Sequence, residues 1–342
     1  MNILQIHDEP WDSGLAHYAL TLSAELKRRG HDVRFWAAAG SWAARQARGL
    51  GLATAELRRP WLKLPRLREE ISRAGVELID AHTGSSHALA AGLAAGSSAR
   101  LVRTRADARP ARGGVLSRAL ARRTALFIAA NQTIAAELRS AFPSSRVETA
   151  FQGLAVPAPR PLPEEPVVGI LARMDLVKGH DDLFRAARGL MAEDARTVFL
   201  AAGDGILRGA IEEAAAALRG RFRVLGRVPD ALDFIASCRI GVVASRGSEA
   251  VSRAALEWMS LGRPLLATRV GCLPELVEDG VTGILVPPRD PPALAQALKR
   301  LLEDPRRAQA MGEAARRRFL ERFTLEAFAA RTEALYWEVL KA

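Results

Sequence analysis

The sequence predicts an α/β fold made of two doubly wound, Rossmann-like domains. Short apolar, β-rich runs alternate with helical patterns along the chain, and 342 residues exceed the usual length of one domain. A proline-rich segment interrupts the alternation near the middle of the chain. Repetition of strand and helix at this pitch is typical of a parallel sheet with helices on both faces.

The first domain is expected over residues 1–155. A helix is expected over residues 17–29, where Ala19, Leu22 and Leu26 recur at helical spacing and Gly30 follows as a C-cap glycine. The expected strands are residues 1–6, 31–36, 76–81, 99–104 and 125–129.

Residues 156–166 are expected to link the domains, because their five prolines cannot continue a helix or a central strand. The second domain is expected over 167–320, and 321–342 are expected to form a C-terminal helix that can pack back on the first domain. A cleft between two such domains is a common ligand site. The expected strands of the second domain are residues 167–171, 196–202, 221–225, 240–244 and 264–268.

Composition favours a cytoplasmic protein. Cys238 and Cys272 are the only cysteines, which makes no disulfide framework and fits a reducing compartment. The N-terminal residues do not read as a signal peptide, and no charge-free apolar run reaches about 18 residues, so no membrane span is expected.

The positive charge lies mainly in the first half of the chain. Residues 1–160 carry 23 Lys+Arg against 13 Asp+Glu, whereas the remainder carries 26 against 25. Arg58, Arg59 and Lys63 surround Trp61, a mixture that fits peripheral binding to an anionic membrane, here the inner face of the plasma membrane. A solvated basic face is the competing interpretation. No helix-turn-helix, zinc or aromatic RNA-binding motif is present, so no nucleic-acid partner is expected.

A candidate phosphate site follows the strand at 167–171. Arg173 and Lys178 lie in a loop that leads into a helix expected to begin near Asp181. Ligands bind at the carboxyl ends of such strands, and helix-start amides together with two cations suit a diphosphate. Two solvated basic residues on a loop are the alternative.

A second candidate segment follows the strand at 240–244. Glu249 is expected at the junction of loop and helix, and Glu257 lies eight residues on, a little over two helical turns away and so on roughly the same face. Carboxylates bind vicinal diols, and the amides near Val251 and Ser252 suit a phosphate. A capping glutamate and a surface glutamate are the alternative.

The surrounding motifs resemble the retaining glycosyltransferases of family 4, which have the two-domain GT-B fold. The Arg…Lys-Gly segment at 173–179 precedes the two glutamates, and Gly-Cys-Leu-Pro-Glu-Leu-Val at 271–277 and Asp-Gly-Val-Thr-Gly-Ile-Leu-Val-Pro at 279–287 follow. The resemblance covers most of 167–320. The N-terminal half matches more loosely, at 29–33 and at the strand before His82.

The resemblance implies that the domain at 1–155 binds the acceptor and that the domain at 167–320 binds the nucleotide-sugar, and it implies a role for each matching residue. It implies that Arg173 and Lys178 hold the diphosphate of a nucleotide-diphospho-sugar, that Glu249 contacts the donor sugar and that Glu257 contacts the ribose. Residues 224–228, with Gly226 and Arg227, look like the base-contacting segment. Gly14 looks like the remaining glycine of a phosphate loop in which Ser13 replaces the first glycine.

One departure from the family concerns catalysis. Many relatives have a histidine near the donor sugar after the strand at 99–104, and this chain has Ala106 there. Arg105 or Asp107 substitutes for it, the donor differs, or catalysis rests mainly on positioning and leaving-group stabilisation. We favour the last interpretation, with a contribution from Asp107, and place Arg105 with the basic residues of the acceptor or membrane side.

The expected function is therefore transfer of a sugar from a nucleotide-diphospho-sugar to a glycan or lipid-linked acceptor in lipopolysaccharide or cell-surface polysaccharide synthesis. Retention is implied by the resemblance, and no metal or cofactor is expected, since no Asp-x-Asp or His/Cys metal spacing is found. The alternatives are a sugar-nucleotide 2-epimerase of the same fold and a degenerate nucleotide-sugar-binding subunit. The oligomeric state stays open.

Overall fold

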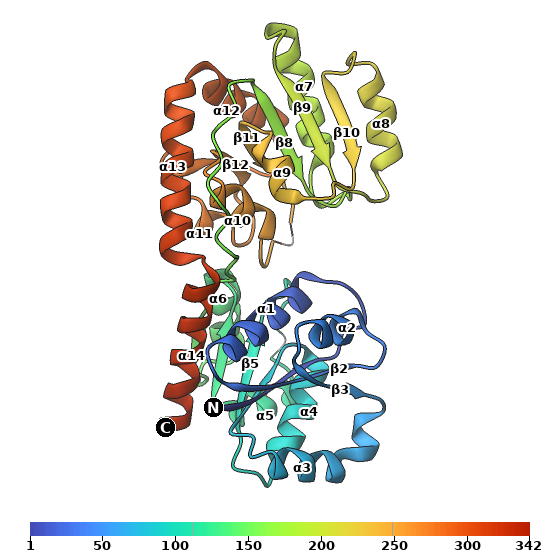
Figure 1. Cartoon of the computed structure of the whole chain (residues 1–342), viewed down its shortest axis with the longest axis vertical. Helices are drawn as coiled ribbons and strands as arrows, with labels where there is room; N and C mark the ends of the chain where they lie inside the picture. The colour runs from blue at the N-terminus through green and yellow to red at the C-terminus, as the bar shows by residue number, and fades with distance from the viewer. Residues whose placement is uncertain (112, 248) are drawn as a thin grey trace. The chain divides into compact units, whose positions relative to one another are not determined.

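The computed structural model describes residues 1–111, 113–247 and 249–342, which divide into two compact units (Figure 1). Unit 1 comprises Met1–Gly153 and Leu325–Ala342, and unit 2 comprises Leu154–Thr324. Each unit contains one parallel sheet covered by helices. The prediction of two doubly wound α/β domains is confirmed.

The chain changes unit at 153/154 and 324/325, whereas the sequence led us to expect changes at 155/156 and 320/321. Helix α13 (Pro305–Arg322) continues past residue 320, and Leu154 N donates to Phe323 O at 2.9 Å, which keeps both segments in unit 2. The proline-rich segment also belongs to unit 2. Buried Arg263 holds it there by donating from Nη1 to Arg160 O (3.1 Å) and from Nη2 to Pro161 O (2.8 Å).

The sheet of unit 1 has the strand order β3-β2-β1-β4-β5-β6-β7, with all strands parallel. The two edge strands, β3 and β7, were missed in the sequence because they are short and partly exposed, without an apolar run. The strands are β1 (Asn2–His7), β2 (Asp32–Ala38), β3 (Ala53–Leu57), β4 (Leu78–Ala81), β5 (Arg100–Arg105), β6 (Leu126–Ala129) and β7 (Val147–Thr149).

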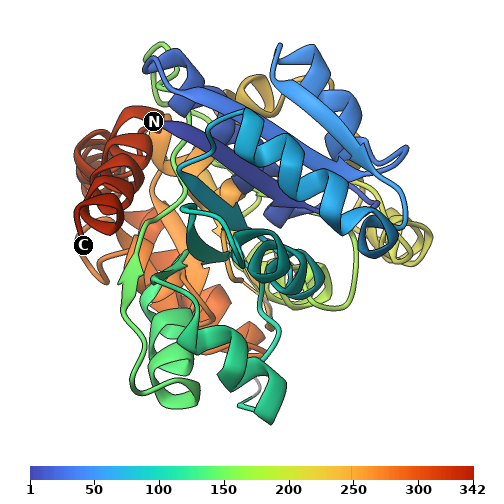
Figure 2. The same ribbon diagram turned by 90° about the horizontal axis from the view of Figure 1, so that it is seen from below.

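Helices cover both faces of this sheet, and α3, α4 and α5 lie on the side nearest the viewer in Figure 2. Side-chain caps fix where several of them begin: Ser13, Thr83 and Asn131 each accept a hydrogen bond from an amide of the first turn. The helices are α1 (Gly14–Arg28), α2 (Trp42–Gly49), η1 (Pro60–Lys63), α3 (Leu64–Arg73), α4 (Gly84–Ala94), α5 (Val115–Arg122), α6 (Gln132–Ala141) and α14 (Leu325–Lys341).

The C-terminal helix α14 is anchored in unit 1 by a buried polar network. Tyr336 Oη donates to Asp80 Oδ2 at 2.6 Å and accepts from Gln5 Nε2 at 3.1 Å. Burial raises the pKa of Asp80 to about 6, against the hydrogen bonds from Tyr336 and Thr104, which favour the carboxylate. No helix in the described part of the chain is long and apolar enough to cross a membrane.

The sheet of unit 2 has the order β10-β9-β8-β11-β12-β13 and is also parallel. The order reverses between β8 and β11, so the loops after these strands border the crevice in which such sheets bind ligands. The strands are β8 (Val167–Leu171), β9 (Val198–Ala202), β10 (Phe222–Gly226), β11 (Ile240–Val243), β12 (Leu265–Thr268) and β13 (Gly283–Val286). The helices are α7 (His180–Glu193), α8 (Arg208–Ala216), α9 (Ala231–Ala236), α10 (Arg253–Ser260), α11 (Leu273–Leu276), α12 (Pro291–Glu303) and α13.

Candidate functional site

The loops after β8 and β11 are joined through their backbones at the switch point of unit 2. Arg246 N donates to Val177 O at 2.7 Å. Gly179 precedes α7 with φ +69°, and a Cβ there would lie 2.0 Å from Ala244 O. Only glycine tolerates both the positive φ and this approach, so Gly179 holds the two loops together.

Lys178 and Glu249 meet in the space between these loops. Glu249 is buried, and its Oε1 accepts from Lys178 Nζ and from Ser245 Oγ, the latter at 2.5 Å. Thr268 Oγ1 in turn donates to Ser245 O at 2.6 Å, which fixes the loop to β12. The structure therefore presents a cation and a carboxylate side by side, each held by its own loop.

These side chains line a cavity of about 180 Å³ at the carboxyl ends of β8 and β11. Val251 and Ser252, which precede α10, also line it. Four of the residues expected to bind the donor, Lys178, Glu249, Val251 and Ser252, are thus brought together. The cation, the carboxylate and the helix start make the cavity suited to a ligand that carries both phosphate and hydroxyl groups.

Gly271 sets the position of the Glu249 backbone. Its φ is +52°, and a Cβ there would lie 2.1 Å from Glu249 O. Cys272 N donates to the same carbonyl at 2.8 Å. The 271–277 motif therefore supports the site by placing Glu249 rather than by lining the cavity.

Arg246 is a supporting residue that the sequence analysis missed. Its Nε donates to Asp182 Oδ2 at 2.6 Å and its Nη2 to Asp181 Oδ2 at 2.6 Å, which ties the loop to the first turn of α7. These bonds, above all those to Asp182, raise the pKa of Arg246. The signal in the sequence was weak: two aspartates at a helix start and an arginine after a later strand.

His180 is buried beside the Lys178 loop in the first turn of α7. Neither ring nitrogen has a hydrogen-bond partner in the part of the chain that the structure describes. Burial lowers its pKa to about 4, so the ring is neutral near pH 7. A neutral imidazole adds no charge to that of Lys178.

Arg173 and Glu257 lie outside the cavity lining. The Arg173 side chain is 80% exposed, with Nη2 at 3.3 Å from Asp175 Oδ2. Glu257 Oε1 accepts from Arg253 Nε at 2.7 Å on α10. The expectation that the two glutamates share a helical face is wrong, because α10 begins at Arg253 and Glu249 precedes it.

The remaining donor-side candidates are spread over both units. Gly226 ends β10 with φ +68°, beside the guanidinium of Arg208, and the Arg227 side chain is 87% exposed. Gly14 is the first residue of α1 in unit 1, and Ser13 caps that helix by accepting from Ala16 N at 3.1 Å. None of Gly226, Arg227 or Gly14 lines the cavity beside Lys178.

The acceptor-side candidates divide into two places in unit 1. Arg105 and Asp107 form an ion pair (Nη2–Oδ1, 2.8 Å) and line a cavity of about 440 Å³, beside which Ala106 is buried. Arg58, Arg59, Trp61 and Lys63 do not line it. They lie at η1, where Trp61 is 54% exposed and Leu62 is 77% exposed.

No group of three or more His, Cys, Asp or Glu side chains suited to a metal ion occurs within residues 1–111, 113–247 and 249–342.

Two family models match the chain, one in each half. Residues 13–154 match "Glycosyltransferase Family 4" and residues 165–304 match "Glycosyl transferases group 1". Together they take in most of unit 1 and of unit 2, including the loops that carry Lys178 and Glu249.

Among curated proteins, the chain is similar to an alpha-D-kanosaminyltransferase of Streptomyces kanamyceticus, with 33% identity over 184 residues, 52% of this chain and 47% of that protein. The chain spans less than half the length of the curated relatives it matches.

Solved structures share the fold over nearly the whole chain. HepE of Anabaena, solved in complex with UDP, superposes with a TM-score of 0.88 at 18% identity and covers 99% of this chain and 100% of its own. A glycosyltransferase of Rickettsia africae also gives 0.88 at 18% identity, over 99% of this chain and 98% of its own. HepE is also solved in complex with UDP-glucose, with a TM-score of 0.79 at 18% identity over 98% of this chain and 99% of its own.

Proposed function

This chain belongs to the family-4 glycosyltransferases of the GT-B fold, and from that membership we propose that it transfers a sugar from a nucleotide-diphospho-sugar to a glycan or lipid-linked acceptor. The observation that carries the proposal is the Lys178–Glu249 pair in the cavity at the carboxyl ends of β8 and β11. A cation beside a carboxylate matches a donor in which a diphosphate adjoins the hydroxyl groups of a sugar.

Each side chain has a distinct role in the proposed donor site. Lys178 and the amides ahead of α10 bind the diphosphate, and Glu249 accepts hydrogen bonds from sugar hydroxyls. Arg173, whose side chain is exposed, reaches the diphosphate as a second cation after a change of rotamer. The UDP and UDP-glucose complexes of HepE support a nucleotide-sugar as the ligand.

In the proposed reaction the bond between the anomeric carbon and the phosphate oxygen breaks, and its electron pair stays on that oxygen. The acceptor hydroxyl forms the new glycosidic bond and loses its proton to the departing phosphate. Lys178 stabilises the charge that develops on the leaving group; such preorganised groups often supply the largest catalytic term. Retention of configuration and independence from metal ions are part of this proposal.

The acceptor is proposed to belong to lipopolysaccharide or cell-surface polysaccharide synthesis, at the inner face of the plasma membrane. Exposed Trp61 and Leu62 beside Arg58, Arg59 and Lys63 support contact with anionic lipid. Flotation with vesicles that contain phosphatidylglycerol should recover the wild type, and Arg58→Gln/Arg59→Gln/Lys63→Gln should reduce the recovery. Equal recovery of both proteins would remove the membrane part of the proposal.

Calorimetric titration tests donor binding. The ligands are UDP, GDP and ADP and the corresponding nucleotide-diphospho-glucose and nucleotide-diphospho-mannose compounds. Lys178→Ala and Glu249→Ala should each weaken the preferred nucleotide-sugar at least about tenfold, because each removes one charged contact. Lys299→Ala is the matched control, since Lys299 on α12 forms an exposed ion pair with Glu193, the last residue of α7. Unchanged affinity in both site variants refutes the donor site.

Product analysis separates the alternatives with the same fold. Donor turnover without any acceptor identifies a 2-epimerase or a hydrolase. Tight donor binding with no turnover in the presence of acceptor preparations identifies a binding subunit. The alanine at position 106, where many relatives have a histidine, is the observation behind this alternative.

A further inference from the structure

A second cavity lies in unit 1, at the carboxyl end of β5. Its volume is about 440 Å³, which is within the usual range for a small-molecule site. Arg103 and Arg105 alternate with Thr104 along β5 and therefore share one face of the sheet, the face covered by α4 and α5. Both arginines line the cavity, together with His87 at the start of α4.

Arg103 is buried and forms no ion pair within the described part of the chain. It is 4% exposed, and its Nη1 donates to Ala81 O at 2.8 Å and to Thr104 O. Among the described residues, no carboxylate lies within ion-pair distance of its guanidinium group. Burial lowers its pKa to about 10, although Asp107 opposes the shift. Asp80 and Asp8 also oppose the shift, but neither forms an ion pair with Arg103 among the described residues. Because a buried cation without a direct ionic partner is costly, an anionic group bound at this wall would be stabilised by Arg103.

The other charged groups on the wall already have partners. Arg105 Nη2 donates to Asp107 Oδ1 and to Arg109 O, and Arg109 Nη2 donates to Glu9 Oε1 at 3.1 Å. Among the described residues that line the cavity, three arginines thus face the one carboxylate of Asp107, and Glu9 is bound to the exposed Arg109. The side chains of this lining therefore carry a net positive charge, and Arg103 is the arginine among them that has no ion pair.

His87 contributes a neutral ring. Its Nε2 lies 2.8 Å from Thr124 Oγ1, and Thr124 donates its own proton to Leu120 O at 2.8 Å, so the ring donates from Nε2. Burial and the nearby Arg103 lower the pKa of His87 to about 3. The ring is then neutral near pH 7, and Nδ1 is left as a hydrogen-bond acceptor for a hydroxyl group.

The remaining wall is apolar. Phe127 and Phe142 stack with ring centroids 5.5 Å apart and planes at 15°, and Pro110, Leu120 and Leu138 line the same cavity. An apolar group of the ligand can therefore lie beside the cation, as in many small-molecule sites.

We propose that this cavity binds the acceptor, and that the acceptor carries a phosphate or carboxylate group that pairs with Arg103 while an apolar or ring-shaped part lies on Phe127 and Phe142. This inference deepens the proposed function, and the identification of the ligand as the acceptor rests on that function. The binding of an anionic amphiphile in unit 1 can be measured independently of donor binding in unit 2.

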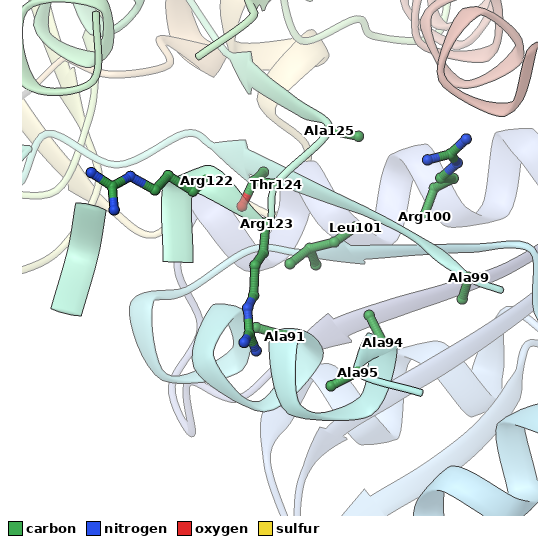
Figure 3. Close-up of a pocket in the computed structure, with 10 residues that line it drawn as sticks. All are labelled: Ala91, Ala94, Ala95, Ala99, Arg100, Leu101, Arg122, Arg123, Thr124 and Ala125. Atoms are coloured by element: carbon green, nitrogen blue, oxygen red, sulfur yellow. The ribbon is translucent and has the colours of Figure 1, made fainter. Parts of the chain in front are cut away.

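A cavity at the opposite end of β5 supplies the control (Figure 3). Arg100, Arg122 and Arg123 line it, and all three are exposed. Arg100 and Arg122 point in different directions, and Arg123 extends along Ala91 of α4. No buried, unpaired cation faces it among the described residues that line it. Arg100→Gln removes the same charge from the same strand and leaves the Arg103 cavity intact.

The test uses the full chain and three probes in calorimetric titrations: phenyl phosphate, inorganic phosphate and benzyl alcohol. Saturating UDP is present in a parallel series to occupy the donor site. We expect phenyl phosphate to bind at least about tenfold more tightly than either fragment, because only it meets both parts of the cavity. Arg103→Gln should lose at least about tenfold of that affinity, and Arg100→Gln should keep it.

Additional ligands identify the chemical source of the anion, and a second variant keeps the test decisive if Arg103→Gln does not fold. Benzoate in place of phenyl phosphate shows whether a carboxylate suffices, and phosphatidylglycerol vesicles with Arg103→Gln show whether a lipid headgroup is the source. If Arg103→Gln fails to fold, Phe142→Leu decides, because it should weaken phenyl phosphate and leave inorganic phosphate unchanged.

Two outcomes overturn the inference: phenyl phosphate binding that survives Arg103→Gln in a folded protein, or binding that UDP abolishes and Lys178→Ala removes. If UDP binds and phenyl phosphate does not, the proposed ligand site at Arg103 is refuted and the proposed donor site in unit 2 is retained. Phenyl phosphate binding at Arg103 without any nucleotide-sugar binding keeps the anion site and refutes the proposed function.

Discussion

Lys178 and Glu249 form an ion pair across 71 positions of the chain, with 21% of the lysine side chain and 1% of the glutamate side chain exposed. The carboxylate has a second donor in Ser245. A diphosphate that enters the cavity therefore meets a cation whose partner is fixed, and it competes with Glu249 for that cation. This relationship underlies the first prediction.

Lys178→Met should destabilise unit 2 by about 3–5 kcal/mol, because it leaves the buried Glu249 carboxylate without its cation. Lys178→Met/Glu249→Gln should recover much of the loss, since no uncompensated charge then remains. Guanidinium denaturation followed by hydrogen exchange of unit 2 peptides measures both. Lys299→Met breaks an exposed pair and should leave the stability nearly unchanged. An equal cost for both lysines contradicts the prediction.

Gly179→Ala should prevent the β8 and β11 loops from meeting. A Cβ at 179 lies 2.0 Å from Ala244 O, so the loop must move, and both stability and nucleotide-sugar affinity should fall. Gly280→Ala is the matched control in unit 2, since its φ is +80° but no atom of the described residues lies within 4 Å of the added Cβ. The control should lose only the backbone term of about 1–2 kcal/mol. Calorimetric titration of both variants checks this; full affinity in Gly179→Ala would falsify the close-approach argument.

Arg246→Ala should cost about 3–5 kcal/mol, because Asp182 is 1% exposed and loses the guanidinium that neutralises it. Arg185→Ala removes an exposed cation 3.7 Å from Asp181, and a change below about 1 kcal/mol is expected. Chemical denaturation of the two variants gives the comparison. If Arg185→Ala proved as costly as Arg246→Ala, the bonds from Arg246 would not be what fixes the loop.

Mild acid should destabilise unit 1 more than unit 2. The pKa values of His7, His82 and His87 in unit 1 are lowered to about 3, chiefly by burial, and that of His180 in unit 2 is lowered to about 4. A lowered histidine pKa contributes stability above the unfolded value of 6.5, and this contribution is lost as pH falls towards 3–4.

Asp80 acts in the opposite direction. Its pKa is raised from 3.8 to about 6, so its contribution is present at low pH and lost as pH rises through 6. It offsets part of the effect of the three histidines of unit 1. Hydrogen exchange at pH 7.5 and 4.5, corrected for intrinsic rates, should show the larger loss of protection in unit 1. Greater acid lability of unit 2 would contradict the sign or size of these shifts.

Most of the fold followed from local pattern. Buried strands such as β8 and β11 are apolar runs that can be read without knowledge of their neighbours. Three edge strands were missed: β3, β7 and β13. β3 and β7 are short and partly exposed and lack an apolar run, whereas β13 is an apolar run that was assigned only to a family motif.

The site was only partly predictable for a related reason. Lys178, Glu249, Val251 and Ser252 were named from motifs, and the structure places them around one cavity. Glu257 was expected on the same helical face as Glu249. However, Glu249 O accepts from Cys272 N and not from the helix that follows, so α10 starts too late to include both glutamates.

By itself, the sequence determined two α/β domains, the family motifs and the absence of a histidine at position 106, because periodicity and residue type are local properties. Only the tertiary structure decided that Lys178 pairs with Glu249, that Arg246 holds α7, and that Arg103 is buried without an ion pair to any described residue. Strand order determines these relationships: β8 lies beside β11 and β5 lies between β4 and β6, so residues far apart in the chain share one environment. Which charged side chains lie close together depends on which strands are adjacent in the sheet, so the charge balance of each site cannot be read from residue types along the chain.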